Sequence, residues 1–273
     1  MKRIVYILSI MLLAVSCQVI HENEQMVEVF TPADTSQIKH ASLLIEYSGW
    51  RCVNCPNAAE VAHELKEQYG EELVVVVMHP ATNPNTRYGN NQAVNYTCPE
   101  ADSIYLHMGG TTTTSFPTGN INFQKQNNSY FTSMDTWATQ VSQYYTSSPI
   151  IMNQTLNYTD SIVDIELYLC SMSSSTLETT LQIWLTEDSI VGKQYIPTTG
   201  KATNDYVHNH LLRASVLPSV WGEKHQLPSI TPTTLHFQYA LPEKVVVKNC
   251  NVVSIISVGG VAIQVKETKI TTK

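Results

Sequence analysis

Charged side chains are scarce in this chain of 273 residues, and basic side chains are the scarcer of the two signs. Only 14% of the residues are charged, and 16 Lys and Arg stand against 23 Asp and Glu, which gives a formal net charge of −7. A typical soluble domain has about 25% charged residues. Because binding to a phosphate backbone needs a basic face, this balance excludes nucleic acid as a partner.

The sequence also lacks the motifs that mark many enzymes and cofactor sites. It has no Gly-rich phosphate loop and no GxSxG nucleophile motif, and no cluster of paired carboxylates indicates a hydrolase. A zinc site would need further ligands, and neither a second CxxC nor an HxxxH is present. His208-Asn209-His210 has no third ligand nearby, so we expect no metal ion and no cofactor.

The first residues have the pattern of an export signal. Lys2 and Arg3 precede an apolar stretch, Ile4 to Val15, that only Ser9 interrupts. A bilayer span needs about 20 apolar residues, so this stretch is typical of a signal peptide. Residues 13–17, Leu-Ala-Val-Ser-Cys, resemble a bacterial lipobox, in which the cysteine becomes the lipid-modified first residue. We expect 1–17 to be a lipoprotein signal peptide with lipidated Cys17. The alternative is an ordinary signal peptide cleaved near Ser16.

After a polar stretch at 18–38, which we expect to be a tether, comes a pair of cysteines in a strand–helix–strand pattern. A β-prone run at 43–47 leads into Cys52-Val53-Asn54-Cys55, and apolar residues then recur at helical spacing as far as Tyr69. The continuous apolar run 73–78 is typical of a buried parallel strand. A CxxC motif at the start of a helix in a βαβ unit indicates a thioredoxin-like redox motif.

The chemistry of such a motif gives the two cysteines different roles. Unpaired N–H groups and the helix dipole at a helix start lower the pKa of the first thiol below about 8.5. Cys52 would therefore attack a disulfide, and Cys55 would resolve the mixed disulfide. Export makes a purely structural Cys52–Cys55 disulfide equally consistent with the sequence, and both interpretations stay open.

Pro117 is the third residue of this expected site. Ser115-Phe116-Pro117-Thr118 precedes a short strand at 120–123, and this order resembles the thioredoxin fold, which places a cis-proline before its third core strand, facing the CxxC. The resemblance implies that Pro117 shapes a groove for client proteins. Helices are expected at 99–107 and from 134 to 145, the latter with Ser133 as its N-cap.

Helical periodicity ends near Ser147-Ser148-Pro149, and short alternating runs follow. The predicted strands are 150–156, 162–169, 180–185, 210–217, 235–240, 252–256 and 261–266. About seven strands with polar turns indicate an immunoglobulin-like sandwich. Cys170 falls on the polar face of its strand, so we leave Cys98, Cys170 and Cys250 as unassigned thiols. The expected fold class is an α/β thioredoxin-like domain at 39–148 followed by an all-β immunoglobulin-like sandwich at 149–273.

Several segments together resemble one family of proteins. They are the lipobox, Gly49 to Pro56, Phe116 to Gly119, Glu187 to Tyr195, and Tyr206-Val207-His208-Asn209-His210-Leu211-Leu212-Arg213. The chain is similar, from about Leu43 to Val265, to the Gram-negative outer-membrane lipoprotein family named "outer membrane protein twenty-eight". The resemblance implies a thioredoxin-like domain, an immunoglobulin-like domain and an outer-membrane anchor. Some members of the family are regarded as surface adhesins or receptors.

Two functions follow from these observations. The first is thiol–disulfide exchange on exported protein clients by an anchored oxidoreductase. The second is a surface binding or adhesion module, facing the periplasm or the exterior, in which the Cys52–Cys55 disulfide is structural. In both cases we expect the protein to be held at the membrane through Cys17.

Overall fold

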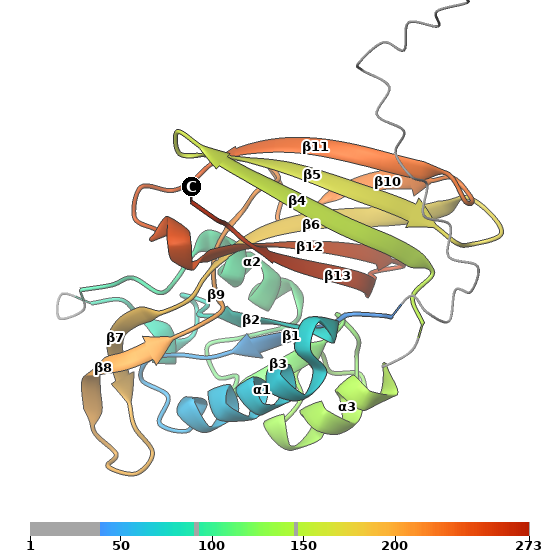
Figure 1. Cartoon of the computed structure of the whole chain (residues 1–273). Helices are drawn as coiled ribbons and strands as arrows, with labels where there is room; N and C mark the ends of the chain where they lie inside the picture. The colour runs from blue at the N-terminus through green and yellow to red at the C-terminus, as the bar shows by residue number, and fades with distance from the viewer. Residues whose placement is uncertain (1–38, 90–92, 145–146, 273) are drawn as a thin grey trace, which may run out of the picture. The chain divides into compact units, whose positions relative to one another are not determined.

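The computed structural model describes residues 39–89, 93–144 and 147–272, and strands dominate it (Figure 1). Of these residues, 45% lie in strands and 19% in helices. The helices are α1 (Cys55–Tyr69), α2 (Pro99–His107) and α3 (Trp137–Gln143), with 3-10 turns at Gly70–Glu72, Pro84–Thr86, Met134–Thr136 and Val247–Asn249. The strands are β1 (Ser42–Tyr47), β2 (Leu73–Met78), β3 (Thr118–Ile121), β4 (Ile150–Thr159), β5 (Ile162–Ser171), β6 (Leu177–Glu187), β7 (Ile190–Tyr195), β8 (Ala202–His208), β9 (Leu211–Ser215), β10 (Glu223–Leu227), β11 (Pro232–Ala240), β12 (Cys250–Val258) and β13 (Val261–Lys269).

One mixed sheet contains strands from both halves of the chain. Its order is β13-β12-β6-β9-β2-β1-β3, and β10 pairs with β6. β1 and β2 are parallel, whereas β3 runs antiparallel to β1. β9 joins β2 in parallel where Val77 pairs with Leu211, and the Val77 N–H donates to the carbonyl of His210 at 2.8 Å. The remaining paired strands form a three-stranded sheet, β11-β5-β4, and the hairpin β7-β8.

The helices α1 and α3 cover one face of β1–β3, as Figure 1 shows below the sheet. Leu44, Leu73 and Val75 pack there against Ala58 of α1 and Trp137 of α3. Burying these side chains contributes about 1.5–3 kcal/mol each to folding.

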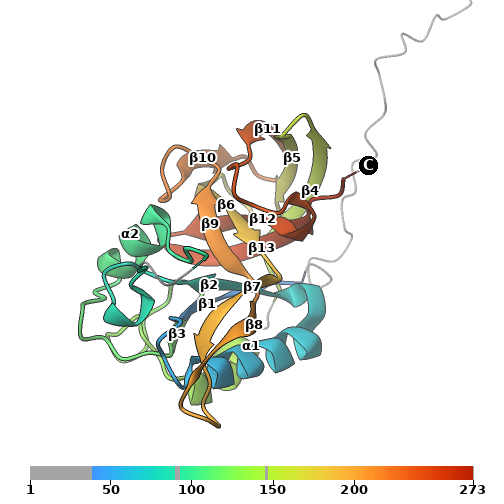
Figure 2. The same ribbon diagram turned by 90° about the vertical axis from the view of Figure 1, so that its left-hand side faces the viewer.

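The opposite face of the same strands packs against α2 and the later strands. Ile45 and Val76 share this core with Ile104 of α2 and with Trp184 and Val253 from β6 and β12. Figure 2 shows α2 beside β9, on the side away from α1. Strands buried on both faces need apolar side chains at successive positions, which is why 73–78 is a continuous apolar run.

The three-stranded sheet covers a second region of the large sheet. Val163, Ile165 and Leu167, the alternating residues of β5, are buried against Leu181 and Ile183 of β6. The alternation therefore separates a core face from a solvent face, as it does in any half-buried sheet.

The predicted fold class is wrong. The structure is mostly β, with mixed and antiparallel sheets, and it shows no clear thioredoxin-like α/β domain ahead of an immunoglobulin-like sandwich. The physical reason is strand pairing: β2 accepts β9 as its neighbour, so the sheet of the βαβ unit continues into β6, β12 and β13. The domain ranges 39–148 and 149–273 stay a prediction.

Candidate functional site around the Cys52–Cys55 disulfide

Cys52 and Cys55 lie where β1 passes into α1, and they form a disulfide. Their Cα atoms are 5.4 Å apart, and Cys55 is the first residue of the helix, followed by Pro56 in its first turn. Pro56 suits this position because the first N–H groups of a helix have no intrahelical partner. The pair is thus held at the positive end of the α1 dipole.

Both cysteines are covered by the surrounding chain. The exposed fractions are 5% for Cys52 and 2% for Cys55, whereas Val53 between them is 37% exposed. A thiolate must reach one sulfur of a disulfide to exchange with it. In the folded protein Val53 is therefore much more exposed than the two cysteines on either side of it.

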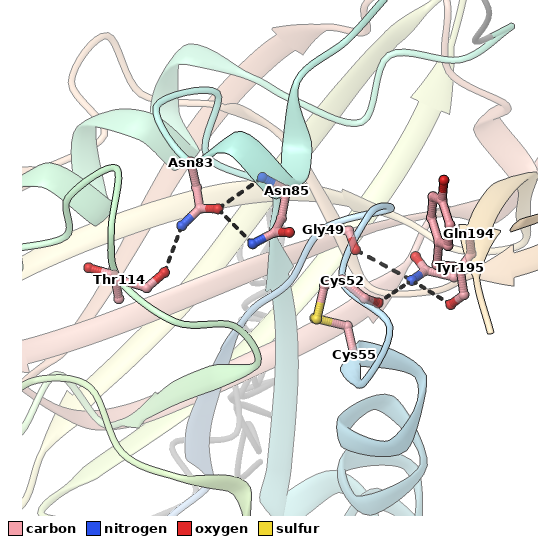
Figure 3. Close-up of a disulfide and its surroundings, with 8 residues drawn as sticks. All are labelled: Gly49, Cys52, Cys55, Asn83, Asn85, Thr114, Gln194 and Tyr195. Atoms are coloured by element: carbon pink, nitrogen blue, oxygen red, sulfur yellow. Dashed lines mark hydrogen bonds between the residues drawn. A yellow bond between two sulfur atoms is a disulfide. The ribbon is translucent and has the colours of Figure 1, made fainter. Parts of the chain in front are cut away.

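The β7 strand supplies a large part of this cover. The Gln194 side-chain amide donates to the carbonyl of Cys52 at 2.9 Å, to that of Tyr195 at 3.1 Å and to that of Gly49 at 3.4 Å (Figure 3). Gln194 is itself only 2% exposed. A residue 142 positions along the chain from Cys52 thus fixes the CxxC loop in place.

Aromatic contacts reinforce the attachment of β7 to this loop. Trp50 stacks on Tyr195 with ring centroids 6.1 Å apart, and the Tyr195 N–H donates to the carbonyl of Trp50 at 2.9 Å. The guanidinium of Arg51 and the ammonium of Lys193 lie 4.6 and 5.1 Å from the Trp50 ring. Cation–π contacts of this kind contribute about 0.5–1 kcal/mol at exposed sites.

A second loop holds the CxxC from the other side. The carbonyl of Asn85 accepts from the N–H of Arg51 at 3.0 Å, and a Cβ at Gly49 would lie 2.7 Å from that carbonyl oxygen. The Asn83 side chain orders this loop by accepting from Asn85 and donating to the carbonyl of Thr114 at 2.9 Å (Figure 3). Gly49 is therefore the residue that lets the two loops approach each other.

Pro117 follows a cis peptide bond from Phe116, as the resemblance implies. The next residue, Thr118, pairs with Tyr47 at the end of β1. Pro117 accordingly lies at the end of the sheet from which the loop to Cys52 departs. Its role in shaping a client groove stays a prediction, as do the catalytic roles of Cys52 and Cys55.

Glu46 is a buried carboxyl close to this site that the motif does not include. Its side chain is 1% exposed. Burial raises the pKa of Glu46 from 4.5 to about 7, and the Ser48 side chain offsets part of the rise. Glu46 and Pro56 line a common pocket of about 500 Å³. The site therefore contains a group that titrates near neutral pH.

The remaining thiols in the described part of the chain are free and poorly placed for nucleophilic chemistry. Cys170 and Cys250 are buried and Cys98 is half-buried. Burial raises the pKa of Cys98 and the pKa of Cys250 to about 12, so neither forms a thiolate at neutral pH. Within these same ranges no group of His, Cys, Asp and Glu side chains could hold a metal ion.

The sequence motifs indicate Cys52, Cys55 and Pro117, but no motif indicates Gln194, Asn83 or Glu46. Glu46 did carry a signal, because a single carboxylate interrupts the apolar run of β1. Gln194 belongs to a segment that the family resemblance includes, but nothing in its spacing links it to Cys52. Side chains that approach from distant strands are set by tertiary pairing, which local patterns do not record.

The expected lipidation residue, Cys17, lies outside the described residues. Across the ranges that the structure does describe, no helix has the length and apolar character needed to cross a membrane.

Comparison with known proteins identifies the chain at the level of its family. Residues 109–273 match the model of the family described as "Outer membrane protein Omp28". No curated protein sequence matches. Among solved structures, HBP35 of Porphyromonas gingivalis is similar in fold, with a TM-score of 0.65, 14% identity, and coverage of 86% of this chain and 76% of that chain. A domain of the outer membrane lipoprotein Omp28 from the same organism is 19% identical, covers 45% of this chain and 89% of that one, and has a TM-score of 0.32.

The family match shows that this chain is an outer membrane protein. The chain belongs to the Omp28 family. The predicted family and the predicted outer-membrane localisation are both confirmed. Attachment through a lipid on Cys17 stays a prediction.

Proposed function

We propose that this protein is a non-catalytic binding module of the outer membrane, in which the Cys52–Cys55 disulfide is structural. The observation that carries this proposal is the cover over the pair, 5% and 2% exposed beneath a loop fixed by Gln194. An exchange site needs an approach path to one sulfur, and the low exposure of both cysteines in the folded state argues against one.

The surface composition supports a binding role as well. Only 14% of the residues are charged. Hydroxyl and amide side chains, which adapt readily to different hydrogen-bonding partners, are enriched in surfaces evolved for recognition. The location at the outer membrane, taken from the family, gives such a surface access to molecules outside the cytoplasm.

Thiol–disulfide exchange is the second candidate, and Glu46 is the observation that favours it. A carboxyl whose pKa is about 7, in a pocket that it lines together with Pro56 beside Cys55, could accept or donate a proton. In this reaction the Cys52 thiolate attacks a client disulfide and releases one client thiolate. The Cys55 thiolate then attacks the Cys52 sulfur and releases the second client thiol, which leaves this chain oxidised and the client reduced. A further round needs an external dithiol reductant.

Trapping of mixed disulfides separates the two candidates. The chains with Cys52→Ser and with Cys55→Ser are each incubated with a disulfide-bonded model peptide, and adducts are counted by non-reducing electrophoresis and mass spectrometry. The binding-module proposal predicts no adduct with either variant, because the remaining thiol is covered. A stable adduct with Cys55→Ser and none with Cys52→Ser would overturn it in favour of exchange.

A control variant shows whether the cover is the cause. Gln194→Ala removes the hydrogen bonds to the CxxC loop. In the Cys55→Ser background this change is expected to make Cys52 open to alkylation by iodoacetamide. If alkylation is already fast with Gln194 in place, the cover does not protect the pair and the proposal fails.

A further inference from the structure

We propose that a pocket of about 200 Å³ between α2, the loop after β3 and the sheet is a binding site for a single neutral sugar ring. The proposal rests on the proposed function, and it names the class of ligand that the binding module takes. No residue of the Cys52–Cys55 site lines this pocket.

Aromatic side chains form the walls of the pocket. Trp221, Phe123 and Tyr130 line it together with His107, whose ring centroid lies 4.3 Å from that of Trp221. Trp221 is 39% exposed, which is unusual for so large an apolar side chain on a folded protein. The C–H groups on the flat face of a sugar ring make weak favourable contacts with such aromatic faces.

Uncharged polar side chains also line the pocket. Thr180 and Gln182 come from β6, and Ser257 comes from β12. Ser257 is 4% exposed, and its hydroxyl is buried without a hydrogen-bond partner. A buried hydroxyl without a partner is unfavourable, so a ligand hydroxyl that reached it would relieve that cost.

The residues that line the pocket include no Asp, Glu, Lys or Arg. A charged ligand would lose its hydration without gaining an ion pair, so the chemistry favours a neutral ligand. The volume is below the roughly 300–1,000 Å³ of sites for drug-sized molecules and is of the size of one ring. A neutral sugar combines an apolar face with hydroxyl groups at its edge, which matches a lining of aromatic side chains together with an amide and hydroxyl groups.

Trp221 lies on a tight, hydrogen-bonded turn. The Gly222 N–H donates to the carbonyl of Ser219 at 2.9 Å, and Gln182 donates to the carbonyl of Val220 at 2.9 Å. Gly222 has φ of 80°, and a Cβ there would lie 2.0 Å from the carbonyl oxygen of Leu181. Only glycine fits this turn, so the backbone that carries the indole is held in place before any ligand arrives.

Phe123, which also lines the pocket, is held in an uncommon conformation. Its φ is 57°, in the left-handed region that bulky residues seldom adopt. The Gln124 N–H bonds the carbonyl of Ile121 at 2.9 Å, and the Phe123 ring packs edge-on to Trp184 at 6.0 Å. Such strained positions cluster at ligand sites, where the surrounding structure maintains them.

Tryptophan fluorescence tests the proposal directly, because Trp221 is the exposed indole. The exposed fractions of Trp50, Trp137 and Trp184 are 6%, 0% and 0%. Full-length chain in detergent is titrated with glucose, galactose, mannose and N-acetylglucosamine. We expect a saturable change in emission with at least one of these sugars, together with protection of the indole from acrylamide quenching.

Variants then locate the site. Trp221→Ala, followed by calorimetry because the reporter is lost, is expected to weaken binding by at least about tenfold. Ser257→Ala keeps the indole and is expected to weaken binding by about fivefold. Tyr88→Ala removes another exposed aromatic side chain, 53% exposed and outside the pocket, and should leave binding unchanged.

Three results would overturn the proposal. They are no saturable response to any of the four sugars, unchanged sugar affinity in Trp221→Ala, or a response to N-acetyl-tyrosinamide in place of the sugars, which would make the pocket a site for a peptide side chain. None of these results changes the Cys52–Cys55 disulfide, so the structural role of that disulfide is decided separately by the trapping experiment.

Discussion

Glu46 is a buried carboxyl whose ionised form is disfavoured in the folded protein. Its carboxyl is buried, and burial raises its pKa to about 7 although the Ser48 side chain offsets part of the rise. Titratable side chains that line the same pocket are Glu60, His63, Tyr206 and His210. None of these accepts or donates a hydrogen bond to Glu46 in the structure, so its protonated form is the one that the fold favours near neutral pH.

We expect Glu46 to make folding weaken as the pH rises. Between pH 4.5 and about 7 the folded protein keeps a proton that the unfolded chain releases, so the free energy of unfolding falls across this window. The total loss is about 3 kcal/mol and is complete above pH 7. Urea denaturation from pH 4 to 8 should show that Glu46→Gln removes this component, whereas the exposed Glu64→Gln leaves it.

The comparison must be made as a difference between variant and parent, because His208 has the opposite effect. Burial lowers the pKa of His208 to about 4, so its contribution to stability grows as the pH rises from 4 toward 6.5. If the parent and Glu46→Gln chains have parallel stability curves over pH 4.5–7, the buried carboxyl is not protonated in the fold.

The disulfide has a modest expected effect on stability. Closing a loop with a sequence separation of 3 restricts the unfolded chain little, which corresponds to about 2 kcal/mol. The double variant Cys52→Ala/Cys55→Ala should lose about that amount in urea denaturation, and the free-thiol control Cys98→Ala should lose less. A double variant as stable as the parent would contradict a structural role for the pair.

At the residue scale, the sequence reveals those site residues that lie close together along the chain. Cys52, Cys55 and Pro56 are adjacent along the chain, and the cis bond before Pro117 follows from the resemblance. Gln194 is remote in sequence, and its contact with Cys52 depends on where the β7–β8 hairpin docks. No local pattern carries that information.

Individual helices and strands are predicted accurately from the sequence where the local pattern is strong. The predicted strand 73–78 and helix 99–107 coincide with β2 and α2, because an unbroken apolar run and a Pro-to-Gly bounded segment are clear signals. The strands β7, β8 and β10 were not predicted. β7 contains Gly192, and β8 and β10 are largely polar and exposed, so alternation does not reveal them.

The junction between β2 and β9 is the element-scale feature on which the large sheet depends. Leu211 pairs there with Val77 and is 0% exposed. We expect Leu211→Ala to lower the free energy of unfolding by about 3 kcal/mol, since it leaves a cavity at the junction.

The matched control for this substitution is Leu106→Ala in α2, where the leucine is 51% exposed and the change should cost less than about 0.5 kcal/mol. Chemical denaturation of the two variants gives both values. Equal losses would mean that the junction contributes no more to stability than the surface does.

At the scale of the whole molecule, most of the strands are predicted from the sequence, but the way they combine into sheets is not. The order β13-β12-β6-β9-β2-β1-β3 joins strands from both halves of the chain. The apolar face of each strand could be buried against several different strands. Long-range packing, which the local sequence does not record, determines which strands become neighbours. The family, in contrast, could be identified from short segments, because it depends on residue identity and not on strand pairing.

Membrane attachment is a property of the whole molecule that can be tested at one residue. If Cys17 carries a lipid, cells fed a labelled fatty acid should label the parent chain and the Cys98→Ala control, but not Cys17→Ala. Loss of label would be accompanied by release of the protein from the membrane fraction, since acyl chains bind by burying methylene groups. Equal labelling of Cys17→Ala would exclude the predicted anchor.

The reduction potential of Cys52–Cys55 in the folded chain decides whether this disulfide is structural. Graded dithiothreitol buffers, alkylation and mass spectrometry give this value. We expect a potential below about −300 mV, with reduction only as the chain unfolds. A value of about −120 to −270 mV in the folded protein would contradict a structural role for the disulfide, because a pair in that range exchanges readily with other thiols.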